Sequence, residues 1–362
     1  MFNVGIIGCG VVSREHIEAY RATPGVALKA VCDMNLGQAE QLARRYKIPR
    51  FYGDFASMLQ NEDLQLVSVC TPYNVRSQVV IPVVEKGINV LVEKPFAMTV
   101  VEADEMLEAA RANGVSLCVV HNILFQPTTR RLLSFIRRGK IGRFIGAEIG
   151  FVSDGSDWIS QNKNHWCHSL PGGRFGEGMP HVVYLALALA GPLQIEDVFI
   201  AQLGSRPWLN PDELRVILRS PEGCLVSFYN TLNANRYDIY IDVYGMEGQI
   251  HANLVNSTLT FLRKRDWLSR PAILWDNISA SCGGLTSFPL HVAMSIKDGH
   301  PHKIIIESLV KSIREKTPPP VSPEMALQTV VLCEDICRRI ESMKKSGGNH
   351  QEVGLARRRS EV

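Results

Sequence analysis

The chain has 362 residues, of which 46% are hydrophobic and 21% are charged, and its formal net charge is +3. This composition is typical of a globular protein, and so small a charge excludes a strongly basic nucleic-acid surface. Because a single hydrophobic core rarely extends beyond about 300 residues, we expect about two domains.

The chain starts directly with an apolar strand pattern, and no apolar run reaches the length of about 18 residues that a membrane helix needs. We therefore expect no signal peptide, no membrane partner and a cytoplasmic location. The nine cysteines are an odd number and lie mostly within apolar runs. This pattern is typical of reduced core thiols rather than of a disulfide framework.

The first 120 residues alternate short β-branched runs with helical patterns. Strands are expected near 4–7, 27–32, 66–70, 88–93 and 115–120, and helices near 13–22, 36–46, 75–87 and 99–113. Strands separated by helices predict a parallel sheet covered on both faces, and right-handed crossovers make it doubly wound. The expected fold class is α/β, with residues 1–120 as a Rossmann domain.

Residues 121–345 follow a different pattern. A helix is expected near 128–138, and strands at 196–203, 214–219, 224–230, 239–244 and 249–262. Their spacing and short turns predict hairpins, so this segment is expected to form an α+β domain with an open, mostly antiparallel sheet. A last helix of about 20 residues should begin at Ser322, and residues 346–362 are expected to be a disordered tail.

A glycine-rich loop follows the first expected strand in "GIIGCGVVSREH". Gly8 and Gly10 fit the first two glycines of a dinucleotide-binding fingerprint, and Ser13 stands at the third position. The second strand ends at Asp33, where a carboxylate would accept the ribose hydroxyls and would repel the 2′-phosphate of NADP. We therefore expect NAD as cofactor, with NADP as an alternative, and cofactor contacts from Gly8, Cys9, Gly10, Val11, Val12 and Asp33.

The strand at 88–93 ends in Glu93, Lys94 and Pro95. Ligands of such sheets bind beyond the carboxyl ends of the strands, which is where this order of residues places Lys94. Beside a nicotinamide, its charge would polarise an alcohol or carbonyl oxygen. A surface salt bridge is the alternative interpretation.

These motifs occur together with "CTP" at 70–72 and with "RRGKIGRFIGAEIG" at 137–150. In this combination the chain resembles the Gfo/Idh/MocA family, the relatives of glucose-fructose oxidoreductase and inositol dehydrogenase. The resemblance implies NAD(P)-dependent redox chemistry at a hydroxyl of a sugar or cyclitol, and a homo-oligomer, a dimer or tetramer. It implies that Lys94 contacts both cofactor and substrate, and it adds Thr71, Pro72 and Glu93 to the expected cofactor contacts.

The stretch "PGGRFGEGMPHVVY" at 171–184 permits three interpretations: a catalytic pair, a phosphate loop or a turn before a helix. No Lys-Ser/Thr follows the glycines, which disfavours the phosphate loop. We expect His181 to be the base that takes the hydroxyl proton, and Glu177, four residues earlier, to be its partner, with Pro180 in the first helical turn. The family usually has aspartate at both of these positions, where this chain has Glu177 and Tyr184.

Substrate contacts are expected from residues at the end of the last Rossmann strand and in the second domain: Lys94, His121, Asn122, Trp166, His168 and Tyr184. The family commonly has Asn and His where this chain has Tyr73 and Arg76, which places the substrate pocket in question. No metal is expected, since the spacing of His165, Cys167 and His168 matches no zinc pattern.

The leading hypothesis is an NAD(P)-dependent dehydrogenase that acts on CH–OH groups of a small polyhydroxylated substrate. One alternative keeps NAD bound and uses transient oxidation to cleave or eliminate a glycoside. Another is a non-catalytic regulator that binds nucleotide and sugar, which the changes at Tyr73, Arg76 and Tyr184 favour mildly.

Overall fold

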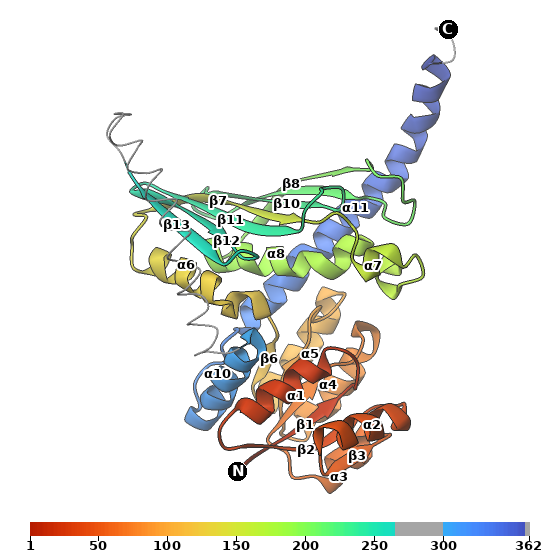
Figure 1. Ribbon diagram of the computed structural model, residues 1–362, viewed down its shortest axis with the longest axis vertical. Coiled ribbons are helices and arrows are strands. Elements are labelled where there is room, and N and C mark those ends of the chain that lie inside the picture. Colours follow the sequence, from red (N-terminus) through yellow and green to blue (C-terminus); the bar gives the residue numbers. More distant parts are fainter. Residues whose placement is uncertain (265–299, 359–362) are drawn as a thin grey trace. The chain divides into compact units, whose positions relative to one another are not determined.

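The computed structural model describes residues 1–264 and 300–358, which form two compact units (Figure 1). The first unit contains residues 1–130 and 300–330, and the second contains residues 131–264 and 331–358. The expected second domain, 121–345, is therefore wrong in its boundaries, because residues 121–130 and 300–330 belong to the first unit.

A six-stranded sheet forms the centre of the first unit, in the order β3-β2-β1-β4-β5-β6. All its neighbours pair in parallel, which confirms the expected doubly wound sheet. The strands are β1 (Phe2–Ile7), β2 (Val26–Cys32), β3 (Arg50–Tyr52), β4 (Leu66–Val69), β5 (Asn89–Val92) and β6 (Leu117–Val119). Only β3 was not expected, because a strand of 3 residues is too short to show a period.

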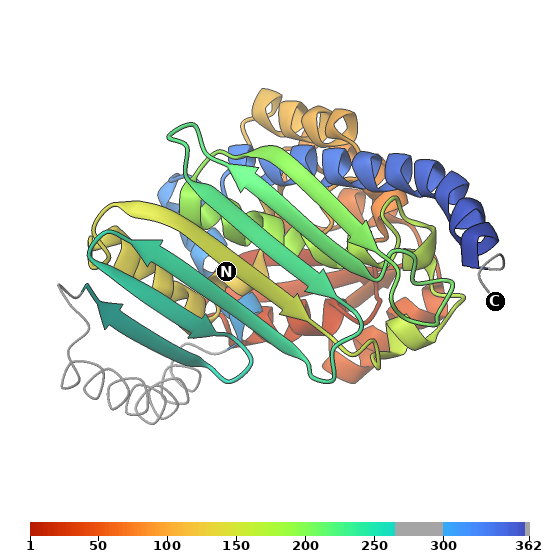
Figure 2. The same ribbon diagram turned by 90° about the horizontal axis from the view of Figure 1, so that it is seen from above.

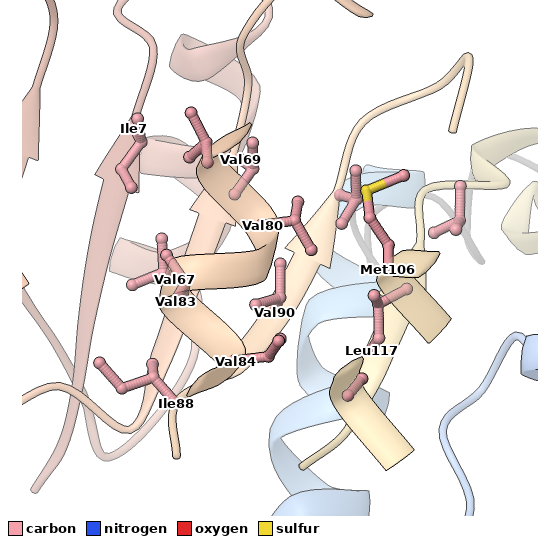
Figure 3. Close-up of a cluster of buried hydrophobic side chains, with 14 of the residues drawn as sticks. Ile7, Val67, Val69, Val80, Val83, Val84, Ile88, Val90, Met106 and Leu117 are labelled. Carbon is pink, nitrogen blue, oxygen red and sulfur yellow. The ribbon is translucent and has the colours of Figure 1, made fainter. Parts of the chain in front are cut away.

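Helices cover both faces of this sheet. One buried cluster joins the sheet to α1 (Ser13–Ala22), α2 (Leu36–Tyr46) and α10 (Pro301–Glu315). The other joins it to α3 (Phe55–Asn61), α4 (Arg76–Glu85) and α5 (Val100–Ala112). Figure 3 shows the second cluster, where Val80, Val83 and Val84 of α4 lie beside strand residues such as Val67 and Val90. The short 3-10 turns η1 (Tyr73–Val75) and η2 (Asn122–Phe125) follow β4 and β6.

Helix α10 was not expected from the sequence. Its buried residues Ile305, Ile306, Leu309 and Val310 pack in the same cluster as Ile17 and other residues near the start of the chain. The partners of α10 are therefore almost 300 residues away in sequence, and no local pattern connects it to the first unit.

A seven-stranded sheet forms the second unit, in the order β13-β12-β11-β7-β10-β9-β8. Only β7 and β10 pair in parallel, so the expected mostly antiparallel sheet is confirmed. The expected strand at 249–262 is two strands, separated by a turn. The strands are β7 (Phe144–Val152), β8 (Gln194–Ala201), β9 (Glu213–Arg219), β10 (Leu225–Thr231), β11 (Asp238–Gly245), β12 (Gly248–Asn253) and β13 (Thr258–Arg263).

Helix α8 (Arg174–Ala190) lies along one face of this sheet and contacts β7 and β10 (Figure 1). Figure 2 looks onto the other face, over which no described helix lies. The remaining helical elements that reach into this unit are α6 (Pro127–Arg137), α7 (Trp158–Gln161), η3 (Trp166–Ser169) and α11 (Pro323–Arg358).

Helix α11 has 36 residues and continues through Gly347 and Gly348, where we expected it to stop. Most of the expected disordered tail, 346–362, is thus helical backbone as far as Arg358. A glycine costs only about 1 kcal/mol in a helix interior, which weakens a helix without ending it. None of the described helices combines the length and apolar character needed to cross a membrane.

Candidate active site

The glycine-rich loop connects β1 to α1 and lies against the end of β4. Gly8 has φ +96°, and a Cβ there would lie 2.7 Å from the carbonyl carbon of Cys70. At Gly10, by contrast, a Cβ would meet nothing within 4 Å. Ser13 Oγ donates to the Gly10 carbonyl at 2.6 Å, which explains a serine at the third fingerprint position. The chain therefore needs Gly8 for its own packing, whereas Gly10 leaves space for a ligand.

Asp33 follows β2 and lies beside this loop. Its Oδ2 accepts from the Cys9 N–H at 2.8 Å, and its Oδ1 accepts from the Asn35 N–H at 2.8 Å. Each oxygen keeps a further lone pair that could accept a hydroxyl. Next to the loop is a pocket of about 260 Å³, lined by Cys9, Gly10, Val11, Arg14, Gln38, Gln41, Leu42 and Arg45. Val11 is exposed, and Val12 precedes α1 as its N-cap.

The contrast between the two glycines gives a matched pair of variants. Gly8→Ala is expected to destabilise the protein by roughly 2–5 kcal/mol, because it combines a left-handed φ with a backbone clash. Gly10→Ala should leave the denaturation midpoint unchanged but weaken NAD binding by roughly tenfold, about 1.4 kcal/mol. Urea denaturation and NAD titration of both variants check this, and equal stability of the two would contradict it.

Lys94 is the second residue after β5, and its peptide bond to Pro95 is cis. Arg76 holds this turn from behind: it donates to the carbonyl of Glu93 at 2.6 Å and to the carbonyls of Pro95 and Thr71. Burial lowers the pKa of Arg76 to about 10. The sequence suggested that Arg76 altered the substrate pocket. The structure instead buries it against backbone carbonyls, where it braces the turn that carries Lys94.

Glu93, an expected cofactor contact, is only 5% exposed and accepts from two buried histidines. His16 Nε2 lies 2.8 Å from its Oε1, and His302 Nε2 lies 3.5 Å from the same oxygen. Its Oε2 accepts from the Lys94 N–H at 3.1 Å. Burial alone would raise the pKa of Glu93, but the hydrogen bonds and charges of His16 and His302 hold it well below its usual range. We did not anticipate this cluster.

The other residues expected in the first unit lie at the ends of strands. Thr71 is half-buried and Pro72 is exposed after β4, and His121 and Asn122 follow β6. His121 is 2% exposed, whereas Asn122 is half-buried at the start of η2. The first unit thus brings the glycine loop, Thr71, Lys94 and His121 to the carboxyl ends of neighbouring strands.

In the second unit, α8 begins at Arg174 rather than near Pro180, so Pro180 lies inside the helix. The segment before α8 passes close to its first turn, which explains the glycine at position 176: a Cβ there would lie 2.4 Å from the Pro171 carbonyl oxygen. Glu177 lies in the first helical turn and accepts from Arg174 Nη1 at 2.7 Å. Arg174, which the sequence did not single out, also lies 3.6 Å from Asp157 Oδ1.

His181 is half-buried on α8, and its Nδ1 lies 2.7 Å from the hydroxyl of Tyr184, which is completely buried. The ring also stacks on Phe151 of β7, with centroids 6.5 Å apart and planes inclined by 10°. When the Tyr184 oxygen accepts from Nδ1–H, Nε2 is left unprotonated and can take a proton. Tyr184 therefore orients His181, a role that differs from the expected substrate contact.

A pocket of about 240 Å³ lies next to Phe151 and the start of α8. Asn230 of β10 lines it and is 4% exposed, and its Oδ1 has no hydrogen-bond partner among the described residues. Trp166 and His168 do not line it: Trp166 is 48% exposed, and His168 Nε2 lies 3.1 Å from the carbonyls of Ile159 and Asn162. The lining residues are Phe151, Ser153, Asp157, Trp158, Ile159, Arg174, Phe175, Gly178, Asn230, Thr231, Leu232 and Tyr237.

Comparison with known proteins places both halves of the chain. Residues 2–121 match the model of an oxidoreductase family with an NAD-binding Rossmann fold, and residues 129–251 match the C-terminal domain model of the same family. A D-apiose dehydrogenase of Paraburkholderia graminis is 30% identical over 167 residues, 45% of this chain and 44% of that protein. A levoglucosan dehydrogenase of Pseudarthrobacter phenanthrenivorans is 26% identical over 285 residues, 69% of this chain and 73% of that protein.

Solved structures show the same fold. A levoglucosan dehydrogenase in complex with NADH and levoglucosan has a TM-score of 0.78 at 23% identity, covering 94% of this chain and 97% of that one. The match to the apiose dehydrogenase spans less than half of that protein's length.

Proposed function

Since the chain belongs to the Gfo/Idh/MocA family of oxidoreductases, we propose that it is an NAD-dependent dehydrogenase acting on a secondary alcohol of a sugar, sugar derivative or cyclitol. The observation that carries the proposal is the open space at Gly10 beside the Asp33 carboxylate, with Lys94 beyond the end of β5 at the same edge of the sheet. The names of the relatives, dehydrogenases of apiose and levoglucosan, support a carbohydrate substrate.

The residues of the first unit fit a dinucleotide. A Cβ would fill the space at Gly10, and this space is what lets the backbone approach a pyrophosphate at the N-terminus of α1. Asp33 would accept ribose hydroxyls, and its charge disfavours the 2′-phosphate of NADP, although Arg14 and Arg45 line the adjacent pocket. The nicotinamide would supply the position that accepts or gives the hydride.

His181 would carry out proton transfer, and Lys94 would stabilise charge on the substrate. Tyr184 holds Nδ1 of His181, so Nε2 is the atom that would take the hydroxyl proton. Lys94, on a turn braced by Arg76 and Glu93, would stabilise the negative charge that develops on the substrate oxygen. Glu177 would also fix Arg174, whose Nη1 lies 2.7 Å from its Oε2.

The Asn230 pocket is the proposed substrate-side recess of the second unit. Its Oδ1 can accept a hydroxyl donor without breaking a bond already made. Aromatic walls from Phe151, Trp158 and Tyr237 suit the apolar face of a sugar ring.

Asn230→Ala is therefore expected to raise the KM for the substrate by about 3- to 10-fold, the value of one net hydrogen bond, with little loss of stability. Asn253→Ala is the matched control, because Asn253 is also buried but donates to Asp238 at 2.7 Å. This control should lose stability and keep its KM. Steady-state kinetics and urea denaturation measure both, and an unchanged KM in Asn230→Ala would refute the role.

A screen of the purified protein with NAD+ or NADP+ against sugars, sugar acids, nucleotide sugars and cyclitols tests the function. Net formation of NADH with one class of alcohol supports it. Product formed without net NADH would indicate transient oxidation, as in a glycoside-cleaving enzyme. Tight NAD binding with no turnover of any class would indicate the non-catalytic regulator instead.

We also propose that the protein acts in the cytoplasm as a homo-oligomer. The described cysteines, such as Cys32 and Cys118, are free thiols, which suits a reducing compartment. The half-buried residues Tyr229, Tyr240 and Tyr244 lie on one face of the seven-stranded sheet, because Tyr229 and Tyr240 both pair with Gly150 and Tyr244 follows Tyr240 by four positions. A second copy would bury these aromatic rings. Sedimentation of the purified protein measures its oligomeric state.

A further inference from the structure

Three potential metal ligands converge where the start of α10 meets α1, within the first unit. They are the side chains of Glu15, His300 and His302, and their ligand atoms all lie within 4.8 Å of one another. His300 Nδ1 lies 3.4 Å from Glu15 Oε2 and 3.3 Å from His302 Nδ1. Glu15 and His300 have side chains that are 45% and 58% exposed, so an ion could reach them from solvent.

The hydrogen bonds of this cluster leave it rich in acceptors. His300 is the N-cap of α10, and its Nδ1 accepts from the His302 N–H. This nitrogen has one lone pair, so an ion bound to it would replace this long contact of 3.5 Å, and the nitrogen also faces the Glu15 carboxylate, which is an acceptor. A proton on His302 Nδ1 could be donated to only one of these two acceptors, His300 Nδ1 or the Glu15 carboxylate. A cation at the centre would satisfy all three atoms at once.

The distances suit a tetrahedral ion. Zinc binds imidazole nitrogen at about 2.0–2.1 Å and carboxylate oxygen at about 2.0–2.2 Å, so neighbouring ligand atoms in a tetrahedron lie about 3.4 Å apart. The separations of 3.4 and 3.3 Å measured from His300 Nδ1 agree with this spacing. Two imidazoles and one carboxylate are also a ligand set that zinc accepts with water in the fourth position.

The second nitrogen of His302 provides an independent observation. Its Nε2 lies 3.5 Å from Oε1 of the buried Glu93, on the side of the ring away from Glu15 and His300. A histidine that binds a metal through one nitrogen characteristically donates its other N–H to a carboxylate, which fixes the tautomer and makes the ligand more basic. Glu93 is held in turn by His16 at 2.8 Å, so its carboxylate is well fixed for this role.

We propose that Glu15, His300 and His302 form a binding site for one divalent transition-metal ion, best suited to zinc, with Glu93 as the carboxylate behind His302. The ion would join α1 to α10 and so tie the 300–330 segment to the Rossmann domain. Through His302 it would also steady Glu93, whose carboxylate holds the Lys94 N–H. No motif with a metal-binding spacing predicts this site, since Glu15 lies far from the two histidines along the chain.

The test is a zinc titration of the full-length protein after treatment with a chelator, followed by calorimetry. A cobalt titration followed by visible absorption reports the tetrahedral geometry. We expect one site per chain, and we expect Glu15→Gln and His300→Asn to weaken binding at least tenfold. Asparagine is a favoured N-cap, so His300→Asn removes the ligand while keeping the start of α10.

His251→Ala is the matched control, because His251 is half-exposed and its Nδ1 lies 2.8 Å from Asp242 in the second unit. It should bind zinc as the unmodified protein does. In the presence of a chelator, both His251→Ala and His300→Asn should keep the denaturation midpoint of the unmodified protein. The proposal would be overturned if the unmodified protein bound no zinc. It would also be overturned if His300→Asn bound zinc as tightly as the unmodified protein. These readouts do not depend on the dehydrogenase activity.

Discussion

Replacement of Lys94 by methionine is expected to lower kcat by roughly 10²–10⁴-fold, the usual contribution of a positioned charge or proton donor. Methionine keeps much of the length and apolar stem of lysine but removes the charge that would stabilise the substrate oxygen. His181→Asn should produce a loss of similar size, because it removes the group proposed to accept the proton. Steady-state rates with the best substrate from the screen measure both effects.

Lys86→Met is the control for the lysine change, since Lys86 is exposed at the end of α4. It should keep the rate of the unmodified enzyme. If Lys94→Met turned over at the rate of Lys86→Met, while still binding NAD, Lys94 would have no part in the reaction. The assignment of His181 would fail separately if His181→Asn kept its rate.

Replacement of Glu93 by glutamine is expected to destabilise the protein by roughly 3–5 kcal/mol, the usual cost of removing one partner from a buried ionic cluster. The carboxylate accepts from His16 and from the Lys94 N–H, and His302 lies within ion-pair distance. Glutamine keeps the shape but removes the negative charge of the buried carboxylate. Urea denaturation in the presence of a chelator measures the change without any contribution from bound metal.

Glu105→Gln is the comparison for this variant, because Glu105 is an exposed residue of α5. Its free energy of unfolding should stay within about 0.5 kcal/mol of the unmodified value. A Glu93→Gln protein as stable as Glu105→Gln would mean that the buried cluster contributes little to the fold.

Local patterns in the sequence were sufficient for five of the six strands of the first sheet, all but the short β3. Helix α1 begins at Ser13 and α2 at Leu36, as predicted, and the Thr99–Glu102 capping box starts α5. These features depend on residues a few positions apart, which periodicity and capping rules describe well. Helix α10 was missed because its partners lie near the start of the chain.

In the candidate site, too, the features set by nearby residues were predicted, and those set by distant partners were missed. The tight turn at Gly8 follows from the loop pattern and has φ +96°, whereas the ribose contact of Asp33 stays a prediction. Arg76 was misread, because nothing local shows that it turns inward toward the carbonyls of residues 71, 93 and 95. Asn230 was missed for a related reason: its significance lies in a hydrogen bond that the fold leaves unmade.

Transfer of a hydride from the substrate carbon to the nicotinamide can be followed with deuterium. The substrate found in the screen would be prepared with deuterium on the carbon that carries the reacting hydroxyl, and the reduced cofactor would be examined by mass spectrometry. We predict that NADH isolated after turnover carries one deuterium and that Lys94→Met forms little of it. Reduced cofactor without deuterium, or full conversion of the substrate with no reduced cofactor, would contradict the account.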